Sequence, residues 1–219
     1  MTEYAATWSA GKDSCLAVWK ALSQGLKVSY LLNFINKDST KSMSHGLSQE
    51  IIAEQAKAMG MPIIQQKTTK GNYEVGFKAA LAGLKHKGIT RLITGDIYLQ
   101  VHRDWIDRVC HEAGVEAMLP LWHLDTDQLL MDFIEAGFKA IVVSTKAEML
   151  GSEWLGRQLD KKLATELKNL NMDPCGEEGE FHTFVYDGPL FQKPIEITKS
   201  EPILRGNRWY LEILECHLG

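Results

Sequence analysis

The sequence predicts an α/β fold, in which an open parallel sheet carries helices on both faces and a smaller C-terminal α+β domain follows. Continuous apolar runs, typical of strands buried on both faces, alternate with amphipathic segments three times in about ninety residues. The connections are short, which implies right-handed crossovers between parallel strands. The pattern changes from Asp125 onward, so we place a boundary between Trp122 and Asp125 and expect one domain over residues 1–122 and another over residues 123–219.

Apolar spacing and capping residues place the elements of the first domain. Ser48 is the expected N-cap of the second helix, and Gly25 and Gly88 end the first and third helices. The predicted strands cover residues 4–8, 28–35, 62–66, 91–97 and 115–121. The predicted helices cover residues 15–22, 48–59, 73–85 and 101–113.

The second domain is expected to mix helices with strands. A helix over 127–136 precedes a strand over 140–143, and a charged amphipathic helix over 153–170 precedes glycine-rich and strand-like segments. In open parallel sheets, ligands bind beyond the carboxyl ends of the strands. The loop 7–14, Asn33 and the pair Gly95-Asp96 should therefore share one rim of the first domain.

Composition limits the class of protein. The chain has 219 residues, of which 45% are hydrophobic and 24% charged, near globular averages. A net charge of -4 without a long basic run argues against a broad nucleic-acid surface. No apolar stretch approaches the roughly 20 residues that span a bilayer. Four separated cysteines without a Cys-x-x-Cys pair fit a reducing compartment, so we expect a cytoplasmic protein with no membrane partner.

The first chemical signal is the small-residue turn that joins the first strand to the first helix. Its backbone can approach a ligand closely, the helix N-terminus adds partial positive charge, and Lys12 adds a full charge. The spacing differs from that of a Walker loop. The turn predicts a phosphate cradle, with an ordinary βα turn and a solvated lysine as the alternative. It reads Thr7-Trp8-Ser9-Ala10-Gly11-Lys12-Asp13-Ser14.

The second signal is an acidic turn over residues 173–184 that runs into a strand. Three acids and a histidine fall within six residues, from Glu177 to His182. Like charges so close repel unless a cation or a cationic ligand joins them. A metal at Glu180 and His182, a substrate or ammonia site, and a solvated acidic turn are the interpretations left open.

These motifs resemble a known family. The loop at residues 9–14 resembles the pyrophosphate loop Ser-Gly-Gly-x-Asp-Ser of N-type ATP pyrophosphatases, with Ala10 in place of the first glycine, which requires that Ala10 keep φ below zero. Over nearly the whole chain, the set of motifs is similar to the diphthine-ammonia ligase family. The other matching segments are Gly95-Asp96-Ile97, Cys175-Gly176-Glu177, Gly179-Glu180 and Asp187-Gly188-Pro189-Leu190-Phe191.

The resemblance implies a Rossmann-like (HUP-type) ATP-binding domain and a C-terminal domain that closes the cleft over an acyl substrate. In that family a carboxylate of diphthine on elongation factor two is adenylated with release of pyrophosphate, and ammonium then forms the amide with release of AMP. Two departures concern the substrate. Gly179-Glu180-Phe181-His182-Thr183 stands where eukaryotic members have Gly-Glu-Tyr-Glu-Thr, and residues 95–103 depart from Gly-Ala-Ile…Tyr-Gln-Arg. A sister branch suspected of amidation in cobalamin salvage is similar to the His182 version, so a small-molecule acid is the alternative substrate.

The resemblance and the rim position nominate site residues. Asp13 is expected to hold Mg²⁺, Glu177 or Glu180 to hold ammonium or take its proton, and His182 is an alternative base. The residues expected to bind ATP are Ser9, Ala10, Gly11, Lys12, Asp13, Ser14, Asn33, His45, Gly95, Asp96 and Arg103. The residues expected to act in catalysis are Lys12, Asp13, Glu177, Glu180 and His182.

Plainer roles stand beside several of these. Asn33 could simply end a strand, Asp96 could cap a turn, and His102 and Arg103 could be a surface pair. For Cys175 we favour a packing or turn role over that of a nucleophile.

Two other classes of protein use similar architecture. A tRNA-modifying enzyme of the same superfamily normally needs paired or persulfide-bearing cysteines and a basic RNA face. A non-catalytic nucleotide-binding protein of the universal-stress type binds phosphates through a later glycine motif. The oligomeric state is open, with a homodimer among the partner predictions.

Overall fold

The first of two sheets is parallel and occupies the N-terminal half of the chain. The computed structural model describes residues 3–219. The strand order is β3-β2-β1-β4-β5, and every neighbouring pair is parallel. The predicted α/β class is therefore confirmed. The strands are β1 (Glu3–Thr7), β2 (Lys27–Asn36), β3 (Ile63–Thr68), β4 (Arg91–Ile93) and β5 (Glu116–Met118).

Helices cover both faces of this sheet, as predicted. Alternate residues of β1 separate the two faces, since Ala6 packs in one apolar cluster and Ala5 in the other. The Ala6 face is covered by α1 (Lys12–Ser23) and α2 (Gln49–Ala58), and the Ala5 face by α3 (Tyr73–His86) and α4 (Gln100–Ala113). Ser48 caps α2 by accepting from the backbone N–H of Ile51 at 3.3 Å. A 3-10 turn, η1 (Lys70–Asn72), precedes α3.

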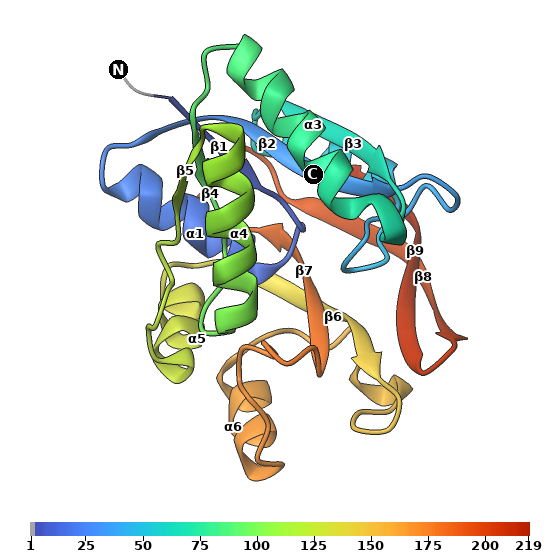
Figure 1. Cartoon of the computed structure of the whole chain (residues 1–219). Helices are drawn as coiled ribbons and strands as arrows, with labels where there is room; N and C mark the ends of the chain where they lie inside the picture. The colour runs from blue at the N-terminus through green and yellow to red at the C-terminus, as the bar shows by residue number, and fades with distance from the viewer. Residues whose placement is uncertain (1–2) are drawn as a thin grey trace.

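The second sheet is antiparallel and has the order β7-β6-β9-β8. Figure 1 shows it in yellow to red beside the parallel sheet, with α6 at the far end from α3. Its strands are β6 (Lys139–Lys146), β7 (Phe181–Asp187), β8 (Ile195–Arg205) and β9 (Arg208–Leu218). The remaining elements are α5 (Thr126–Glu135), the 3-10 turn η2 (Ser152–Trp154) and α6 (Lys161–Asn169).

The helix predicted over residues 153–170 is wrong in its first half. Residues 156–159 instead run alongside β6, where Val142 N–H donates to the Arg157 carbonyl at 3.0 Å. Gly156 has φ +76°, which interrupts a helix. Helix α6 begins only after Asp160, whose side chain accepts from the Leu163 N–H at 2.8 Å. The strand expected over 91–97 is also shorter, because β4 ends at Ile93.

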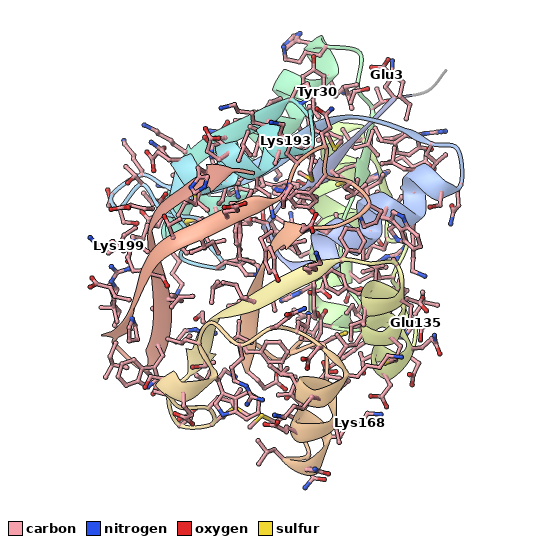
Figure 2. All side chains as sticks on the ribbon, turned by 180° about the vertical axis from the view of Figure 1, so that it is seen from behind. Glu3, Tyr30, Glu135, Lys168, Lys193 and Lys199 are labelled. Carbon is pink, nitrogen blue, oxygen red and sulfur yellow. The ribbon has the colours of Figure 1, made fainter. Side chains whose placement is uncertain are left out.

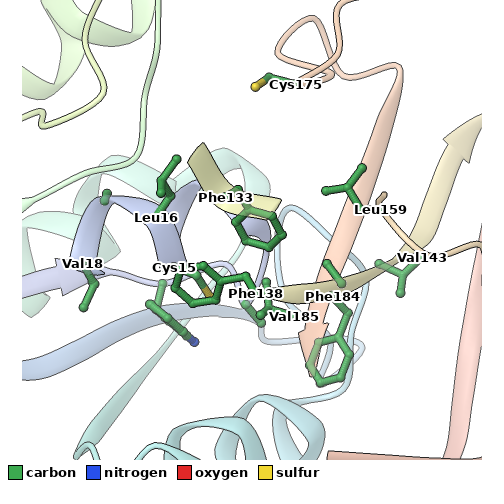
Figure 3. Packing of buried hydrophobic residues seen from close by; sticks show 14 of the residues in the cluster. Cys15, Leu16, Val18, Phe133, Phe138, Val143, Leu159, Cys175, Phe184 and Val185 are labelled. Carbon is green, nitrogen blue, oxygen red and sulfur yellow. The ribbon is translucent and has the colours of Figure 1, made fainter. Parts of the chain in front are cut away.

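One continuous apolar cluster joins the two sheets. It includes Leu16 of α1, Phe133 of α5 and Phe184 of β7. Figure 3 shows these side chains with Phe138, whose ring stacks on Phe133 at 4.9 Å between centroids. The charged side chains labelled in Figure 2, such as Glu135, lie at the periphery instead. Because both sheets share this core, the surface where they meet has a defined geometry.

Within residues 3–219, no helix has the length and apolar character needed to cross a membrane.

Candidate active site

A cavity of about 480 Å³ lies at the carboxyl end of β1. Strands β2 and β4 flank β1 on opposite sides, so this is the point where the strand order reverses and where ligands of open α/β sheets bind. The wall opposite the first sheet comes from the acidic turn and from β7. Ten residues nominated from the sequence line the cavity, namely Ser9, Lys12, Asp13, Ser14, Asn33, His45, Gly95, Asp96, Glu177 and His182.

Ala10 shapes residues 9–14, the phosphate loop, and its conformation shows that the negative φ expected for it from the sequence is wrong. Its φ is +70° rather than negative. A left-handed alanine costs roughly 1–2 kcal/mol and needs tertiary contacts to hold it. Those contacts converge on its carbonyl, which accepts from Val185 N–H at 3.0 Å and from Gln55 Nε2 at 3.0 Å. The buried Gln55 also accepts from Trp8 Nε1 at 2.8 Å and donates to the Val185 carbonyl at 2.6 Å. The loop is thus tied to β7 from the second sheet.

Gly11 allows β7 and the 37–46 loop to close over the phosphate loop. A Cβ at this position would stand 2.8 Å from His45 Nε2 and 3.2 Å from the Thr183 carbonyl oxygen. The N–H groups of Gly11 and Lys12 are engaged inside the protein, by Ser9 Oγ at 3.2 Å and by Thr183 Oγ1 at 3.1 Å. A phosphate would therefore meet the next N–H groups of the first turn of α1, those of Asp13 and Ser14.

Gly95 brings the end of β4 against the same helix start. A Cβ there would stand 2.9 Å from the backbone carbon of Asp13 and 3.0 Å from the backbone nitrogen of Ser14. The end of β4 and the start of α1 are thus in direct contact, as expected for two segments of the same rim.

Lys12 is a buried ammonium, only 5% exposed. Its Nζ donates to Asp13 Oδ2 at 2.8 Å and to the carbonyl of Cys175. Burial alone lowers the pKa of Lys12, but the Asp13 carboxylate and other nearby anionic groups outweigh burial and raise it, so the ammonium stays charged. Burial raises the pKa of Asp13, with Lys12 opposing it.

Cys175 serves the site through its backbone. Its carbonyl accepts from Lys12, while its thiol points to the carbonyl of Thr126 at 3.4 Å. Burial raises the pKa of the Cys175 thiol, which disfavours the reactive thiolate. This arrangement agrees with the turn role favoured from the sequence.

One end of the cavity is acidic. Glu177 Oε1 accepts from the backbone N–H of Ile97 at 3.1 Å. Burial raises the pKa of Glu177 to about 7, the Ile97 N–H opposes the rise, and Asp13 adds to it. Asp96 lies there too, with Oδ1 at 3.3 Å from His102 Nδ1, and this contact raises the pKa of His102.

Asp173 organises the acidic turn that carries Glu177. Its carboxylate accepts from the N–H groups of Cys175 and Glu177 at 3.1 and 3.0 Å, and from the hydroxyl of Tyr98 at 3.2 Å. Three donors on one carboxylate fix the turn, which explains how the clustered acids keep a defined geometry.

The other end is formed by two imidazoles. The rings of His45 and His182 lie 4.5 Å apart in an edge-to-face arrangement. Burial lowers the pKa of His45 to about 3 and lowers the pKa of His182 well below its usual value, with Lys12 and Arg208 acting in the same direction. Both rings are therefore neutral near pH 7 in this structure.

A third part of the wall suits a planar base. Asn33, in the C-terminal half of β2, donates from Nδ2 to the Trp8 carbonyl at 2.7 Å, and its buried Oδ1 has no partner among the described atoms. Phe34 and Tyr73 lie beside it with ring centroids 5.1 Å apart, and Met43 completes the wall. An orphan acceptor in an apolar wall fits the amino group of adenine. These three apolar residues were not predicted from the sequence.

Four nominated residues do not line the cavity. Ala10 and Gly11 shape the loop from behind. Arg103 instead contacts Asp107, from Nε to Oδ2 at 2.6 Å, and stacks over Trp122. Glu180 is 4% exposed and keeps one carboxylate oxygen, Oε2, without a hydrogen-bond partner in the described part of the chain.

Among residues 3–219, no group of three or more His, Cys, Asp or Glu side chains could hold a metal. A Mg²⁺ that arrives with a nucleotide needs only one or two carboxylates, because phosphate oxygens and waters complete its octahedron. The Asp13 carboxylate on the cavity wall meets that requirement.

The fold and the cavity define an α/β Rossmann-like domain whose strand-to-helix loop, residues 9–14, is covered by a second, antiparallel sheet. The chain belongs to the diphthamide synthase family: the family's N-terminal domain matches residues 2–117, and its C-terminal domain matches residues 125–218.

Curated relatives carry one name, diphthine--ammonia ligase. The relative from Schizosaccharomyces pombe is 29% identical over 95% of this chain, which spans 38% of that longer protein. The human relative is 27% identical over 98% of this chain and 91% of its own length. The mouse relative is 26% identical over 91% of this chain and 84% of its own length.

Proposed function

We propose that the chain is an ATP-dependent amidoligase that adenylates a carboxylate and then forms an amide with ammonia. The observation that carries the proposal is the division of one cavity between a phosphate loop with a buried ammonium, Lys12, and an acidic end at Glu177. The phosphate loop with Lys12 suits a polyphosphate, and the acidic end at Glu177 suits ammonium. The names of the relatives favour diphthine as the acid, ahead of a small-molecule acid, a tRNA or no reaction at all.

In the first step, a carboxylate oxygen attacks the α-phosphorus of ATP. The bond from the α-phosphorus to the bridging oxygen breaks, and pyrophosphate leaves with the electron pair. Lys12 and the first-turn N–H groups of α1 face the charge that develops on the leaving group, and they are already in place before reaction. Mg²⁺ bound at Asp13 would supply further positive charge to the phosphates.

In the second step, ammonia attacks the acyl carbon, the C–N bond forms, AMP leaves with the electrons of the acyl–oxygen bond, and the nitrogen releases its surplus proton to water. Ammonium is held by the carboxylates of Asp96 and Glu177, and Glu177 takes its proton. A base with a pKa of about 7 is matched to neutral pH. Glu180 has weaker support for this role because it does not line the cavity, and His182 has weaker support because burial and neighbouring cations disfavour its protonated form.

The test of this proposal is to identify the two products that the reaction forms from ATP. Purified chain with ATP, ammonium and the diphthine-bearing protein should yield AMP and pyrophosphate in proportion to amide. Asp13→Ala should abolish adenylation with little loss of folding, whereas Glu180→Ala tests whether that residue contributes to amide formation alone. ADP as the nucleotide product, or ATP binding without turnover of any candidate acid, would contradict the proposal.

The proposal also includes Mg²⁺, a domain division after residue 122, a homodimer and a cytoplasmic location. The two family matches, which end at residue 117 and begin at residue 125, support the division.

A further inference from the structure

We propose that His45 and His182 form a clamp for the pyrophosphate group, with the charge of Arg208 behind it. This inference rests on the proposed function for its place in the reaction, and it assigns the two imidazoles to the leaving group rather than to the proton of ammonium.

The position of the pair is the first argument. His45 comes from the loop between β2 and α2, and His182 comes from β7, so the two rings reach the cavity from different sheets. His45 Nε2 lies 2.8 Å from the place of a Cβ on Gly11, directly over the phosphate loop. The residue after His182, Thr183, accepts from the Lys12 N–H at 3.1 Å. A phosphate group on the loop therefore lies next to His45, and the His182 ring lies 4.5 Å from the His45 ring on the wall of the same cavity.

The charge around the pair is the second argument. The charged groups that act on the two rings are all cations, Lys12 from α1, Lys146 from β6 and Arg208 from β9. Neither Lys146 nor Arg208 forms an ion pair within residues 3–219, since Lys146 donates to the carbonyl of Glu178 and Arg208 to the carbonyl of Gly179. Neither side chain lines the cavity, but cations without an ion-pair partner behind its wall favour an anion inside it.

Arg208 gives the third argument. Its Nε donates to Ser144 Oγ at 3.1 Å and its Nη1 to the Gly179 carbonyl at 2.8 Å, whereas its buried Nη2 has no acceptor in the described part of the chain. The side chain is held in place by two hydrogen bonds and keeps its charge near the pair. It acts on a bound anion through its field, because Arg208 does not line the cavity.

The acidic and basic groups lie at different ends of the cavity, and this separation argues against ammonium as the ligand of the histidine pair. The carboxylates of Glu177 and Asp96 lie at the acidic end, where Glu177 accepts from the Ile97 N–H and Asp96 contacts His102. An ammonium at the pair would meet cations and neutral rings. A pyrophosphate there can accept hydrogen bonds from both rings, and its arrival favours their protonated, doubly donating forms.

The experiment is direct binding of inorganic pyrophosphate, with Mg²⁺, to the whole purified chain by titration calorimetry. We expect His45→Ala and His182→Ala each to weaken pyrophosphate binding by about tenfold or more, since each removes a hydrogen bond to a charged group. Affinity for AMP should change by less than about twofold, because AMP lacks the group that the clamp holds. His102→Ala is the matched control, a histidine of the same cavity at its acidic end, and should leave pyrophosphate affinity unchanged.

Thermal melts establish that each variant folds, and His182→Phe, which keeps a ring but no donor, replaces His182→Ala if the truncation prevents folding. Unchanged pyrophosphate affinity in the folded variants would overturn the clamp and would return the pair to the acyl substrate or to the ammonia step. Equal losses for AMP and pyrophosphate would overturn it as well, because they indicate general damage to the cavity. Calorimetry measures pyrophosphate binding without any reaction, whereas the amidoligase proposal is tested by product formation. Failure of one proposal can therefore be distinguished from failure of the other.

Discussion

Replacing Glu177 by glutamine should make the protein more stable above neutral pH. Burial holds the folded-state pKa at about 7, against 4.5 for the free side chain. The folded state therefore binds this proton more tightly than the unfolded state, and the stability from that proton is present below pH 4.5 and is lost as pH rises through 7. The full shift corresponds to about 3 kcal/mol, and access of water to the carboxylate reduces the expected cost to about 1–2 kcal/mol.

Urea unfolding at two pH values measures this effect. At pH 8 the Glu177→Gln variant should exceed the wild type by about 1–2 kcal/mol, and at pH 4 the two proteins should agree within about 0.5 kcal/mol. The amide oxygen can still accept from the Ile97 N–H, so the variant removes the charge and keeps the contact. Equal stability at pH 8 would show that the carboxylate is better hydrated than its position indicates.

The same variant should separate the two chemical steps. Exchange of pyrophosphate into ATP, which needs only the acid and the phosphate loop, should stay within about threefold of the wild type, while amide formation should fall by roughly 10²–10⁴-fold. Hydroxylamine, which is already neutral at the assay pH, should restore capture of the acyl-adenylate. If exchange falls as much as amide formation, Glu177 does not act as the base.

Three further substitutions test the geometry of the loop. Ala10→Gly removes the strain of a left-handed alanine, a gain of about 1–2 kcal/mol. It also loses a buried methyl group, about 0.8 kcal/mol, and increases the conformational entropy of the unfolded chain. The free energy of unfolding in urea should therefore change by less than about 1 kcal/mol, and a larger gain or loss would contradict the assignment of strain. Gly95→Ala should raise the KM for ATP by about tenfold or more in steady-state kinetics, because its Cβ would stand 2.9 Å from the backbone of Asp13 and displace the loop. An unchanged KM would mean that the position of the loop is not critical. Gln55→Leu should destabilise the protein by about 1–3 kcal/mol, because it leaves Trp8 Nε1 without its acceptor, and a neutral result in thermal melts would show that water replaces the lost hydrogen bonds.

The sequence predicted the parts of the site that carry local signals. The phosphate loop and the acidic turn each combine small or charged residues in an order that packing alone does not require, and the cavity brings both together. Phe34 and Tyr73 have no such signal, because an apolar residue on a cavity wall looks the same in sequence as one in the core.

Other errors arose where distant contacts decide local structure. The φ of Ala10 depends on hydrogen bonds with Val185 and Gln55, and the bond between those two spans 130 residues. The apolar spacing over 153–170 is helical, yet Gly156 and pairing with β6 hold its first half extended. Both cases show tertiary contacts overriding a local pattern.

The central claim is that a substrate carboxylate attacks the α-phosphorus of ATP in this cavity. The most direct measurement uses an acid labelled with oxygen-18 in its carboxylate, with ATP and ammonium, and mass analysis of the nucleotide product. If the carboxylate attacks the α-phosphorus, one labelled oxygen is transferred to AMP for each amide formed, and none is transferred with Asp13→Ala. Label in inorganic phosphate with ADP as the nucleotide product would show attack at the γ-phosphorus and would contradict the account.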